Sequence, residues 1–358
     1  MLAADALTIV HVVFSSRLAG GERHCIDLAQ AQAALGHRVH LVAPSSSALR
    51  GATGPEVTYH GIKLPLARGL RLRSIAHRVH ADVCHGHLGP ACKAVARVTS
   101  STRIGTLHVG YKAHQHADLD GLICVNRAQF GLLGDYRGDA SVIYNWAPER
   151  EAHDHGDLRA ELGLRPQQLL VGSLGRLNKA KGMDVLVEAF RAFAPPDAVL
   201  AILGEGEELP NLRRLAGGDP RIRLLGFRTD VNASLHAMDL FVSPSREEAF
   251  PLAILEAMRA GLPLIATATQ GPLEMLASQP AQIVPIGSVS ALGEAIATKL
   301  SSIRRIPRDS RQRLTYDVSA FDRTTAVERV VAFYRQMMVH VSERRAPSTL
   351  PAGDADDV

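Results

Sequence analysis

Two basic side chains stand among glycines in the segment Gly172-Ser-Leu-Gly-Arg176-Leu-Asn-Lys-Ala-Lys181-Gly182. The apolar run 169–174 predicts a buried strand, so Arg176 and Lys181 would lie in the loop at its carboxyl end. A guanidinium can hold two phosphate oxygens at once, and an ammonium acts as a point charge. These residues therefore suit a diphosphate, although cations in a surface loop are most often only solvated.

Two glutamates flank the start of a predicted helix over 252–260. Pro251 suits its first turn, and a helix N-terminus with free amides binds phosphate. Glu256 falls about 7 Å further along the axis, at about 1.5 Å per residue, which is within reach of the paired hydroxyls of a ribose. Glu248, in the loop before the helix, can accept hydrogen bonds from another polyol. Two glutamates at this spacing also recur by chance, so the spacing alone decides nothing.

The loop after the first predicted strand, 7–14, lacks the glycine pattern of a dinucleotide-binding fold. It reads Ser15-Ser-Arg-Leu-Ala-Gly20-Gly21-Glu-Arg23, and no acidic residue follows the second predicted strand, 38–43. A nicotinamide-dependent dehydrogenase is therefore not expected. Gly20 and Gly21 leave backbone N–H groups open to an anionic or hydroxyl-rich ligand. An ordinary tight turn explains them equally well.

Short β-branched runs alternate with helical patterns, which predicts two α/β units with parallel sheets. In the first half we expect a helix over 22–35 and strands over 7–14, 38–43, 83–86, 104–108, 121–125 and 141–144. In the second half we expect strands over 169–174, 199–203, 222–225, 240–242 and 262–266, and helices over 183–193, 209–216, 230–237 and 252–260. Two Rossmann-like lobes would hold the ligand in a cleft between their strand ends.

The predicted domains follow from these patterns. Residues 1–150 form the N-terminal domain and 151–323 the second domain. Apolar residues at helical spacing indicate a packing helix over 324–345. The last segment, 346–358, contains two Pro, one Gly and three Asp, and is predicted to be disordered.

Composition excludes several classes of protein. Of 358 residues, 46% are hydrophobic and 21% charged, which is typical of a folded chain and not of a disordered or fibrous one. The net charge of +4 is uneven, because residues 1–150 contain 16 Lys and Arg against 10 Asp and Glu. One Trp and six Tyr offer few stacking surfaces, so no nucleic-acid partner is expected.

Cysteine spacing and hydropathy indicate the compartment. The four cysteines form no CxxC pair and stand in no zinc-ligand spacing, so we expect reduced, buried thiols. The short apolar run near the N-terminus does not suit a signal peptide, and no window reaches about 18 uncharged apolar residues. A cytoplasmic location follows.

The order and spacing of these segments resemble the retaining glycosyltransferases of family 4, which have the GT-B fold. The resemblance covers roughly residues 7–340 and is most specific over 170–275. It rests on the segments 175–190, 203–206, 225–227, 243–258 and 261–266. Looser matches in the first half are Gly20-Gly21-Glu22, 82–87, Thr106-Leu-His108 and 142–145.

The resemblance implies roles for the charged residues. Arg176 and Lys181 match the cations that hold the donor diphosphate and stabilise the nucleotide leaving group. Glu256 matches the residue that binds the ribose. Glu248 matches the carboxylate that contacts hydroxyls of the transferred sugar, and no nucleophilic role is assigned to it. A front-face mechanism assisted by stabilisation of the leaving group is implied.

The resemblance also implies backbone contacts. The amides of Phe250, of Leu252 beside Pro251, and of Ala253 would face sugar and phosphate. Ala249 is a departure, because the family usually has Gly there. A methyl is tolerated unless φ is positive, and it affects the fit of the donor sugar.

His108 is similar to the histidine near the reacting sugar, and Gly20 and Gly21 to the loop beside phosphate and acceptor. Twelve of the sixteen histidines precede residue 150, and we expect most to be structural. The structural group includes His85, His87, His114 and His116. No metal triad and no cofactor are expected, so a chelator should not abolish activity.

The segment 65–80 is rich in arginine and has apolar residues at Leu70, Ile75, Ala76 and Val79. A solvated helix face explains it. The functional interpretation is contact with an anionic membrane, because each nearby cation is favoured by about 1 kcal/mol and acceptors of similar enzymes are often lipid-linked. The enzyme would then be peripheral on the inner face of the cytoplasmic membrane.

Together with these residues, the resemblance implies a metal-independent retaining hexosyltransferase. It would move a sugar from a UDP- or GDP-sugar to a hydroxyl of a glycan or lipid-linked glycan acceptor, in the synthesis of lipopolysaccharide or another cell-envelope or exported polysaccharide. One alternative is a nucleotide-sugar 2-epimerase of the GT-B fold, which needs no acceptor. Another is a non-catalytic subunit that binds nucleotide sugar.

Overall fold

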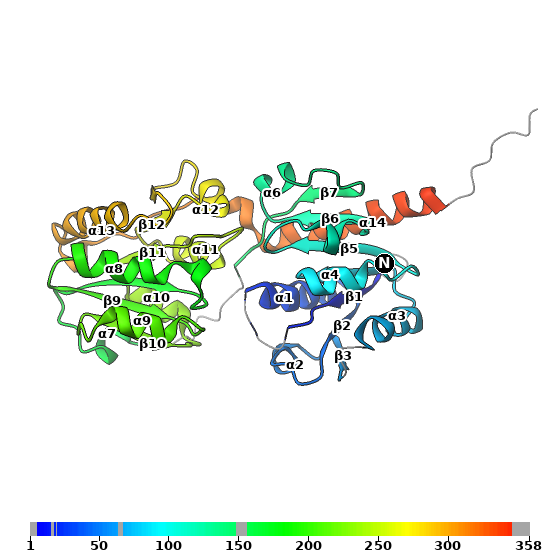
Figure 1. Cartoon of the computed structure of the whole chain (residues 1–358), viewed down its shortest axis with the longest axis horizontal. Helices are drawn as coiled ribbons and strands as arrows, with labels where there is room; N and C mark the ends of the chain where they lie inside the picture. Colours follow the sequence, from blue (N-terminus) through cyan, green and yellow to red (C-terminus); the bar gives the residue numbers. More distant parts are fainter. Residues whose placement is uncertain (1–5, 16–17, 19, 64–66, 148–155, 346–358) are drawn as a thin grey trace, which may run out of the picture.

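The computed structural model describes residues 6–15, 18, 20–63, 67–147 and 156–345. Two α/β lobes lie side by side (Figure 1), and each is built around one parallel sheet. The segment predicted to be disordered, 346–358, lies outside the described residues.

The N-terminal lobe contains a seven-stranded sheet in the order β3-β2-β1-β4-β5-β6-β7. Its strands are β1 (Thr8–Val12), β2 (Arg38–Pro44), β3 (Thr58–Ile62), β4 (Val83–His87), β5 (Thr102–Leu107), β6 (Gly121–Cys124) and β7 (Asp139–Val142). Its helices are α1 (Gly20–Ala34), α2 (Leu49–Ala52), α3 (Arg68–Arg78), α4 (Gly89–Val95), α5 (Ala113–His116) and α6 (Arg127–Gly131).

The second lobe contains a six-stranded sheet in the order β10-β9-β8-β11-β12-β13. Its strands are β8 (Leu169–Leu174), β9 (Ala198–Leu203), β10 (Ile222–Gly226), β11 (Leu240–Ser243), β12 (Leu264–Thr267) and β13 (Ala281–Val284). Its helices are α7 (Leu158–Glu161), α8 (Met183–Phe193), α9 (Leu209–Ala216), α10 (Val231–Ala237), α11 (Leu252–Arg259), α12 (Gln270–Met275) and α13 (Val289–Arg304).

The last helix, α14 (Arg323–Arg345), returns from the second lobe to the first (Figure 1). Its apolar residues, among them Val330 and Tyr334, are buried in one cluster with Ile9 of β1 and Val83 of β4. Because successive strand residues face opposite sides of the sheet, Val10 and Cys84 join a different cluster on the other face. The amphipathic pattern of 324–341 thus corresponds to a helix packed on the N-terminal sheet.

The predicted fold class is confirmed, because each lobe is a parallel sheet with helices. The bounds of β8, α8 and α9 agree with the prediction. The strands β3 and β13 were not predicted. Both lie at a sheet edge and are only partly buried, so their sequences lack a continuous apolar run.

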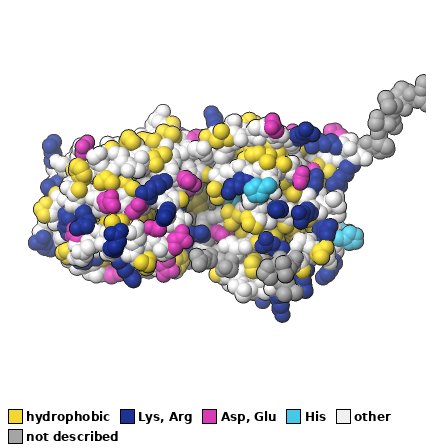
Figure 2. Space-filling model, in the orientation of Figure 1, with side chains coloured by type: hydrophobic (Ala, Val, Ile, Leu, Met, Phe, Trp, Pro, Cys, Tyr) yellow, Lys and Arg dark blue, Asp and Glu magenta, His cyan; other side chains and the backbone are white. Residues whose placement is uncertain are grey.

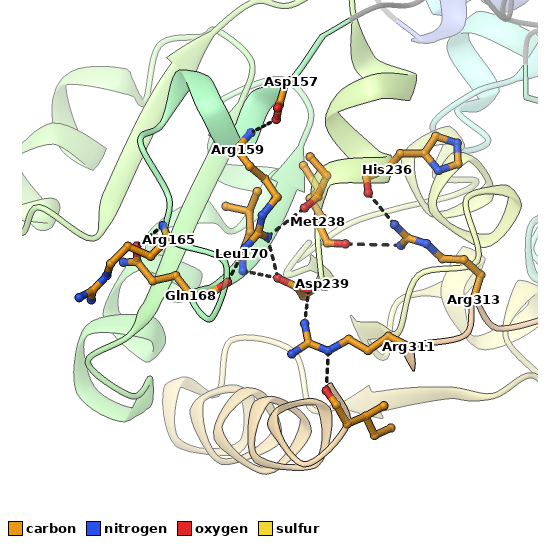
Figure 3. Close-up of polar contacts among 12 residues, drawn as sticks. Asp157, Arg159, Arg165, Gln168, Leu170, His236, Met238, Asp239, Arg311 and Arg313 are labelled. Carbon is orange, nitrogen blue, oxygen red and sulfur yellow. Dashed lines mark hydrogen bonds and ion pairs between the residues drawn. The ribbon is translucent and has the colours of Figure 1, made fainter. Parts of the chain in front are cut away.

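A buried polar network holds the amino ends of β8 and β11 together (Figure 3). Asp239, just before β11, pairs with Arg159 of α7 at 3.0 Å and with Arg311 at 2.6 Å. The same carboxylate accepts the backbone N–H of Leu170 at 2.7 Å. The side chains of Arg159 and Asp239 are each only 7% exposed. A buried charge needs such partners, so we interpret this network as structural.

None of the helices in the described ranges has both the length and the apolar composition that a membrane span requires.

Candidate functional site

A cavity of about 1660 Å³ lies between the lobes, and both lobes contribute to its wall. Figure 2 shows the surface hollowed at this junction. All eleven residues that the sequence predicts to bind or act on substrate line it. They are Gly20, Gly21, His108, Arg176, Lys181, Glu248, Phe250, Pro251, Leu252, Ala253 and Glu256. The carboxyl ends of parallel strands meet at one edge of each sheet, which brings these distant segments together.

The loops that follow β8 and β11 pack closely through a glycine. Gly182 has φ +63°, and a Cβ atom there would lie 2.1 Å from the carbonyl oxygen of Pro244. The backbone N–H of Arg246 also donates to the carbonyl of Ala180 at 2.7 Å. Only glycine suits both the backbone conformation and the space. This contact fixes the side chain of Lys181 opposite the loop that contains Glu248.

Lys181 and Glu248 form an ion pair, with their side chains 29% and 13% exposed. The short 3₁₀ turn Lys179–Lys181 is capped by Asn178, whose Oδ1 accepts the N–H of Lys181 at 3.2 Å. Arg176 is exposed at the cavity and has no ion pair among the described residues. Of the two cations predicted to hold the diphosphate, Lys181 is therefore paired with a carboxylate and Arg176 is available to an anion.

The helix α11 directs its N-terminus into the cavity. Pro251 occupies the N-cap, one position before the predicted first turn, and provides no side-chain cap. The amides of Leu252 and Ala253 follow it, and both residues line the cavity. Helix N-termini attract anions through such amides and the helix dipole. Glu256, one turn further on, also lines the cavity.

Ala249 fits the loop without backbone strain, because it is not among the described non-glycine residues with positive φ. It is 7% exposed, and its carbonyl accepts a hydrogen bond from Nδ2 of Asn126 at 2.7 Å. Asn126 belongs to the N-terminal lobe, so this bond joins the lobes. The methyl group is thus accommodated, and its effect on the donor sugar stays a prediction.

On the N-terminal lobe, Gly20 and Gly21 are the first residues of α1, which begins two residues earlier than predicted. A Cβ atom on Gly21 would lie 3.5 Å from Cγ of His108. A Cβ atom on Gly20 would lie 3.8 Å from Cδ1 of Leu252 in the other lobe. These glycines therefore lie where the two walls approach each other.

His108 follows β5, and its Nε2 lies 3.2 Å from Nδ1 of His87. Burial lowers the pKa of His108 to about 4, so its ring is neutral at pH 7. The other histidines singled out in the sequence do not line the cavity. His85 and His87 are buried in the N-terminal lobe, His114 is exposed, and Nδ1 of His116 accepts the N–H of Lys112 at 2.9 Å.

Among the described residues, one group of side chains has the spacing of a metal site. The ligand atoms of His11, Cys25 and His87 lie within 4.8 Å of one another. The rings of His11 and His87 already hydrogen-bond to each other at 3.0 Å. Burial also raises the pKa of the Cys25 thiol, which disfavours the thiolate that binds metal. All four cysteines are free and buried, as predicted.

The residues that bridge the lobes were not predicted from the sequence. The hydroxyl of Tyr144 donates to Glu274 at 2.5 Å, and the same carboxylate accepts the N–H of Arg127 at 2.8 Å. Arg259 of α11 donates to the carbonyl of Ala147 at 3.0 Å. These contacts depend on how the lobes dock, which no local pattern encodes.

Two family models match the chain, one in each half. The model "Glycosyltransferase Family 4" matches residues 18–149, and "Glycosyl transferases group 1" matches residues 168–302. The lipopolysaccharide core biosynthesis mannosyltransferase LpsB of Rhizobium meliloti is 25% identical over 343 residues, which cover 91% of this chain and 96% of that protein.

Two further proteins are similar to parts or to the whole of the chain. An Escherichia coli UDP-Gal:alpha-D-GlcNAc-diphosphoundecaprenol alpha-1,3-galactosyltransferase is 37% identical over 129 residues, 34% of this chain and 33% of that protein. The crystal structure of Anabaena Alr3699/HepE in complex with UDP-glucose has a TM-score of 0.71 at 20% identity, and covers 94% of this chain and 100% of that one.

Proposed function

The chain belongs to the group 1 glycosyltransferases of family 4 and has the GT-B fold, and from this premise we propose that it transfers a hexose from a UDP- or GDP-sugar with retention of configuration. The observation that carries the proposal is that Arg176, Lys181, Glu248, Glu256 and the N-terminus of α11 line one cavity. Each supplies a contact that a nucleoside-diphosphate sugar needs.

The cations would act mainly on the leaving group. As the glycosidic bond to the diphosphate breaks, negative charge develops on the phosphate oxygen. Arg176, Lys181 and the first-turn amides of α11 offer positive charge and hydrogen bonds to that oxygen, and groups held in place in this way stabilise a transition state. Because these protein groups provide the charge, we propose a metal-independent reaction without a cofactor.

The remaining contacts would orient the donor. Glu256 accepts hydrogen bonds from the ribose hydroxyls, and Glu248 accepts hydrogen bonds from hydroxyls of the transferred sugar. Lys181 lies beside Glu248, so the diphosphate and the sugar would meet at this pair. His108, Gly20 and Gly21 form the opposite wall, where the acceptor hydroxyl would approach.

The acceptor is proposed from the relatives. LpsB acts in lipopolysaccharide core biosynthesis, and the Escherichia coli relative is named for an undecaprenol diphosphate-linked sugar. We therefore propose a hydroxyl of a lipopolysaccharide or other cell-envelope glycan, including a lipid-linked one, as the acceptor. Nucleic acid is not a proposed partner.

A cytoplasmic, peripheral membrane location is proposed from the surface of α3. Arg71, Arg73 and Arg78 are exposed on this helix, and Leu70 is 63% exposed beside them. Ile75, Ala76 and Val79 instead pack against the core, so most of the predicted apolar stripe is structural. Residues 64–66 of the segment lie outside the described residues.

Replacing Lys181 or Glu256 by Ala tests the proposal. We expect either change to remove most turnover while circular dichroism and thermal unfolding stay as in the wild type. Wild-type kinetics in both variants would refute it. Conversion of the nucleotide sugar to an isomer without an acceptor would favour the epimerase, and donor binding without consumption would favour a non-catalytic subunit.

A further inference from the structure

Histidines at alternate positions of neighbouring strands share one face of the N-terminal sheet. His11 lies on β1 and is in register with His85 on β4. His87 ends β4 and is in register with Thr106 of β5, two residues before His108. Since alternate residues of a strand point to the same side, these rings gather under α1 and α14. His11, His85 and His87 are fully buried there.

Three hydrogen bonds connect part of this cluster to the cavity. Oε1 of Gln32, on α1, lies 2.7 Å from Nε2 of His11. Nδ1 of His11 lies 3.0 Å from Nε2 of His87. Nδ1 of His87 lies 3.2 Å from Nε2 of His108, which lines the cavity. The chain Gln32–His11–His87–His108 therefore runs from the core to the proposed substrate.

The protons of this chain can be placed one after another. A neutral imidazole has one N–H and one lone pair, and the bond made by one nitrogen determines the state of the other. A carbonyl oxygen only accepts, so Nε2 of His11 must carry a proton. Its Nδ1 then accepts from Nε2 of His87, and Nδ1 of His87 accepts from Nε2 of His108.

These proton positions require neutral imidazole rings. Burial lowers the pKa of His11 to about 4 and that of His87 well below its usual value. Neighbouring histidines lower the pKa of His87 further. Burial disfavours a second proton on any ring, because it would place a charged imidazolium in the core beside other imidazoles.

The orientation of the Gln32 carboxamide sets the direction of the chain. Its Nε2 has no hydrogen-bond partner among the described residues. Its Oε1 is the atom that lies 2.7 Å from Nε2 of His11, so the carbonyl of the carboxamide faces His11. A reversed carboxamide would invert every proton position.

We propose that Gln32, His11 and His87 fix His108 as the tautomer with its proton on Nε2, so that Nδ1 is a permanent hydrogen-bond acceptor for a sugar hydroxyl in the cleft. Among the described residues the His108 ring makes its side-chain hydrogen bond through Nε2, to His87, and none through Nδ1. A lone pair attracts a hydroxyl proton and repels a phosphate oxygen, which has no proton to offer at neutral pH. His11 and His87 are positioning residues, and the inference rests on the proposed function for its substrate.

Nuclear magnetic resonance of the full chain labelled with ¹⁵N-histidine tests the tautomer directly. Long-range ¹H–¹⁵N spectra show which ring nitrogen carries the proton, and the signals lost in His108→Gln identify His108. We expect the proton on Nε2 at pH 7.5. A proton on Nδ1, or an exchanging mixture of both tautomers, would overturn the inference. A metal ion bound in stoichiometric amount by elemental analysis would also overturn it, because metal would take the same nitrogens.

Variants separate positioning from packing. His87→Leu breaks the chain, and His85→Leu is its matched control on the same strand, because His85 bonds to Tyr334 and Thr106 instead. In His87→Leu we expect His108 to populate both tautomers. We expect kcat to fall by about ten-fold, which corresponds to the loss of one hydrogen bond, and the Kd for UDP or GDP to stay unchanged. His87→Gln, which keeps an acceptor, should recover part of the kcat. Equal kcat losses in His85→Leu and His87→Leu would contradict the inference.

The inference can still be tested if His87→Leu does not fold or if the proposed function is wrong. If His87→Leu does not fold, His11→Gln with the same spectra replaces it, and an unaltered His108 tautomer there would count against the chain. The spectra need no substrate. A chain with Nε2-protonated His108 but no sugar transfer would refute the proposed function alone, and an active enzyme with Nδ1-protonated His108 would refute this inference alone.

Discussion

Lys181 forms an ion pair with Glu248 at the cavity, while Arg176 has no ionic partner among the described residues. The pair joins the loops after β8 and β11, which Gly182 allows to approach. A diphosphate that binds Lys181 must therefore compete with the Glu248 carboxylate. The site couples the cation proposed for the leaving group to the carboxylate proposed for the sugar.

Glu248→Gln should strengthen the binding of UDP or GDP and weaken turnover. The amide keeps the shape of the side chain but releases Lys181 and removes a repulsive charge, so we expect a Kd lower by about three- to ten-fold at low salt. Calorimetric titration measures this.

Glu247→Gln is the matched control, because Glu247 lines the same cavity and has no ion pair among the described residues. A Kd that changes equally in both variants would show that the ion pair with Lys181 plays no special part.

Asp239→Asn should destabilise the second lobe by about 3–5 kcal/mol, because it leaves the buried guanidinium of Arg159 without its counter-ion. Urea unfolding followed by circular dichroism gives the free energy of unfolding. Asp197→Asn is the control, since Asp197 and Arg304 form a partly exposed pair whose loss should cost no more than about 1 kcal/mol. Equal stability of Asp239→Asn and the wild type would contradict a structural role for the network.

Stability should fall as the pH falls from about 6.5 to about 4. The folded pKa values of His11 and His108 are lowered to about 4, so the unfolded chain binds protons in this window and the folded chain does not. Each pKa unit corresponds to about 1.4 kcal/mol. Unfolding free energies at several pH values should show a shallower slope for His11→Gln than for the wild type. Superimposable slopes would mean that His11 makes no such contribution.

The surface of α3 should bind anionic membranes. Figure 2 shows basic side chains across the visible face of the N-terminal lobe. We expect the protein to float with anionic but not with zwitterionic liposomes. The triple variant Arg71→Ala, Arg73→Ala, Arg78→Ala should no longer float, because each cation contributes about 1 kcal/mol of binding free energy.

The triple variant Arg213→Ala, Arg214→Ala, Arg305→Ala, which changes three exposed residues of the second lobe, removes the same charge and is the control. Equal recovery on both kinds of liposome, or on neither, would refute membrane contact.

The sequence predicted the central strands and the cavity residues because their signals are local. Leu169–Leu174 is a short, mostly apolar segment, and the glycines around Arg176 mark the loop at its end. Edge strands such as Thr58–Ile62 contain polar residues and a glycine, because one side faces solvent. Their pairing depends on the neighbouring strand rather than on their own pattern.

Contacts between distant segments could not be predicted in the same way. The ion pair of Lys181 with Glu248 depends on how two loops pack. The bonds of His11 and His87 depend on the register of β1 with β4 and on the placement of α1. The sequence predicted only that His85 and His87 are structural, and the assembled sheet shows which rings touch.

Product analysis tests the central claim most directly. The purified chain is incubated with UDP- and GDP-hexoses and a lipid-linked glycan acceptor, with and without EDTA, beside Lys181→Ala and the exposed control Lys179→Ala. We predict that the products are free nucleoside diphosphate and a glycoside that keeps the donor's anomeric configuration. The rate of product formation should be the same with and without EDTA and unchanged in Lys179→Ala. In Lys181→Ala the rate should be lower by about a hundred-fold. An inverted glycoside, a requirement for metal, or donors left unconsumed with every acceptor would contradict the account.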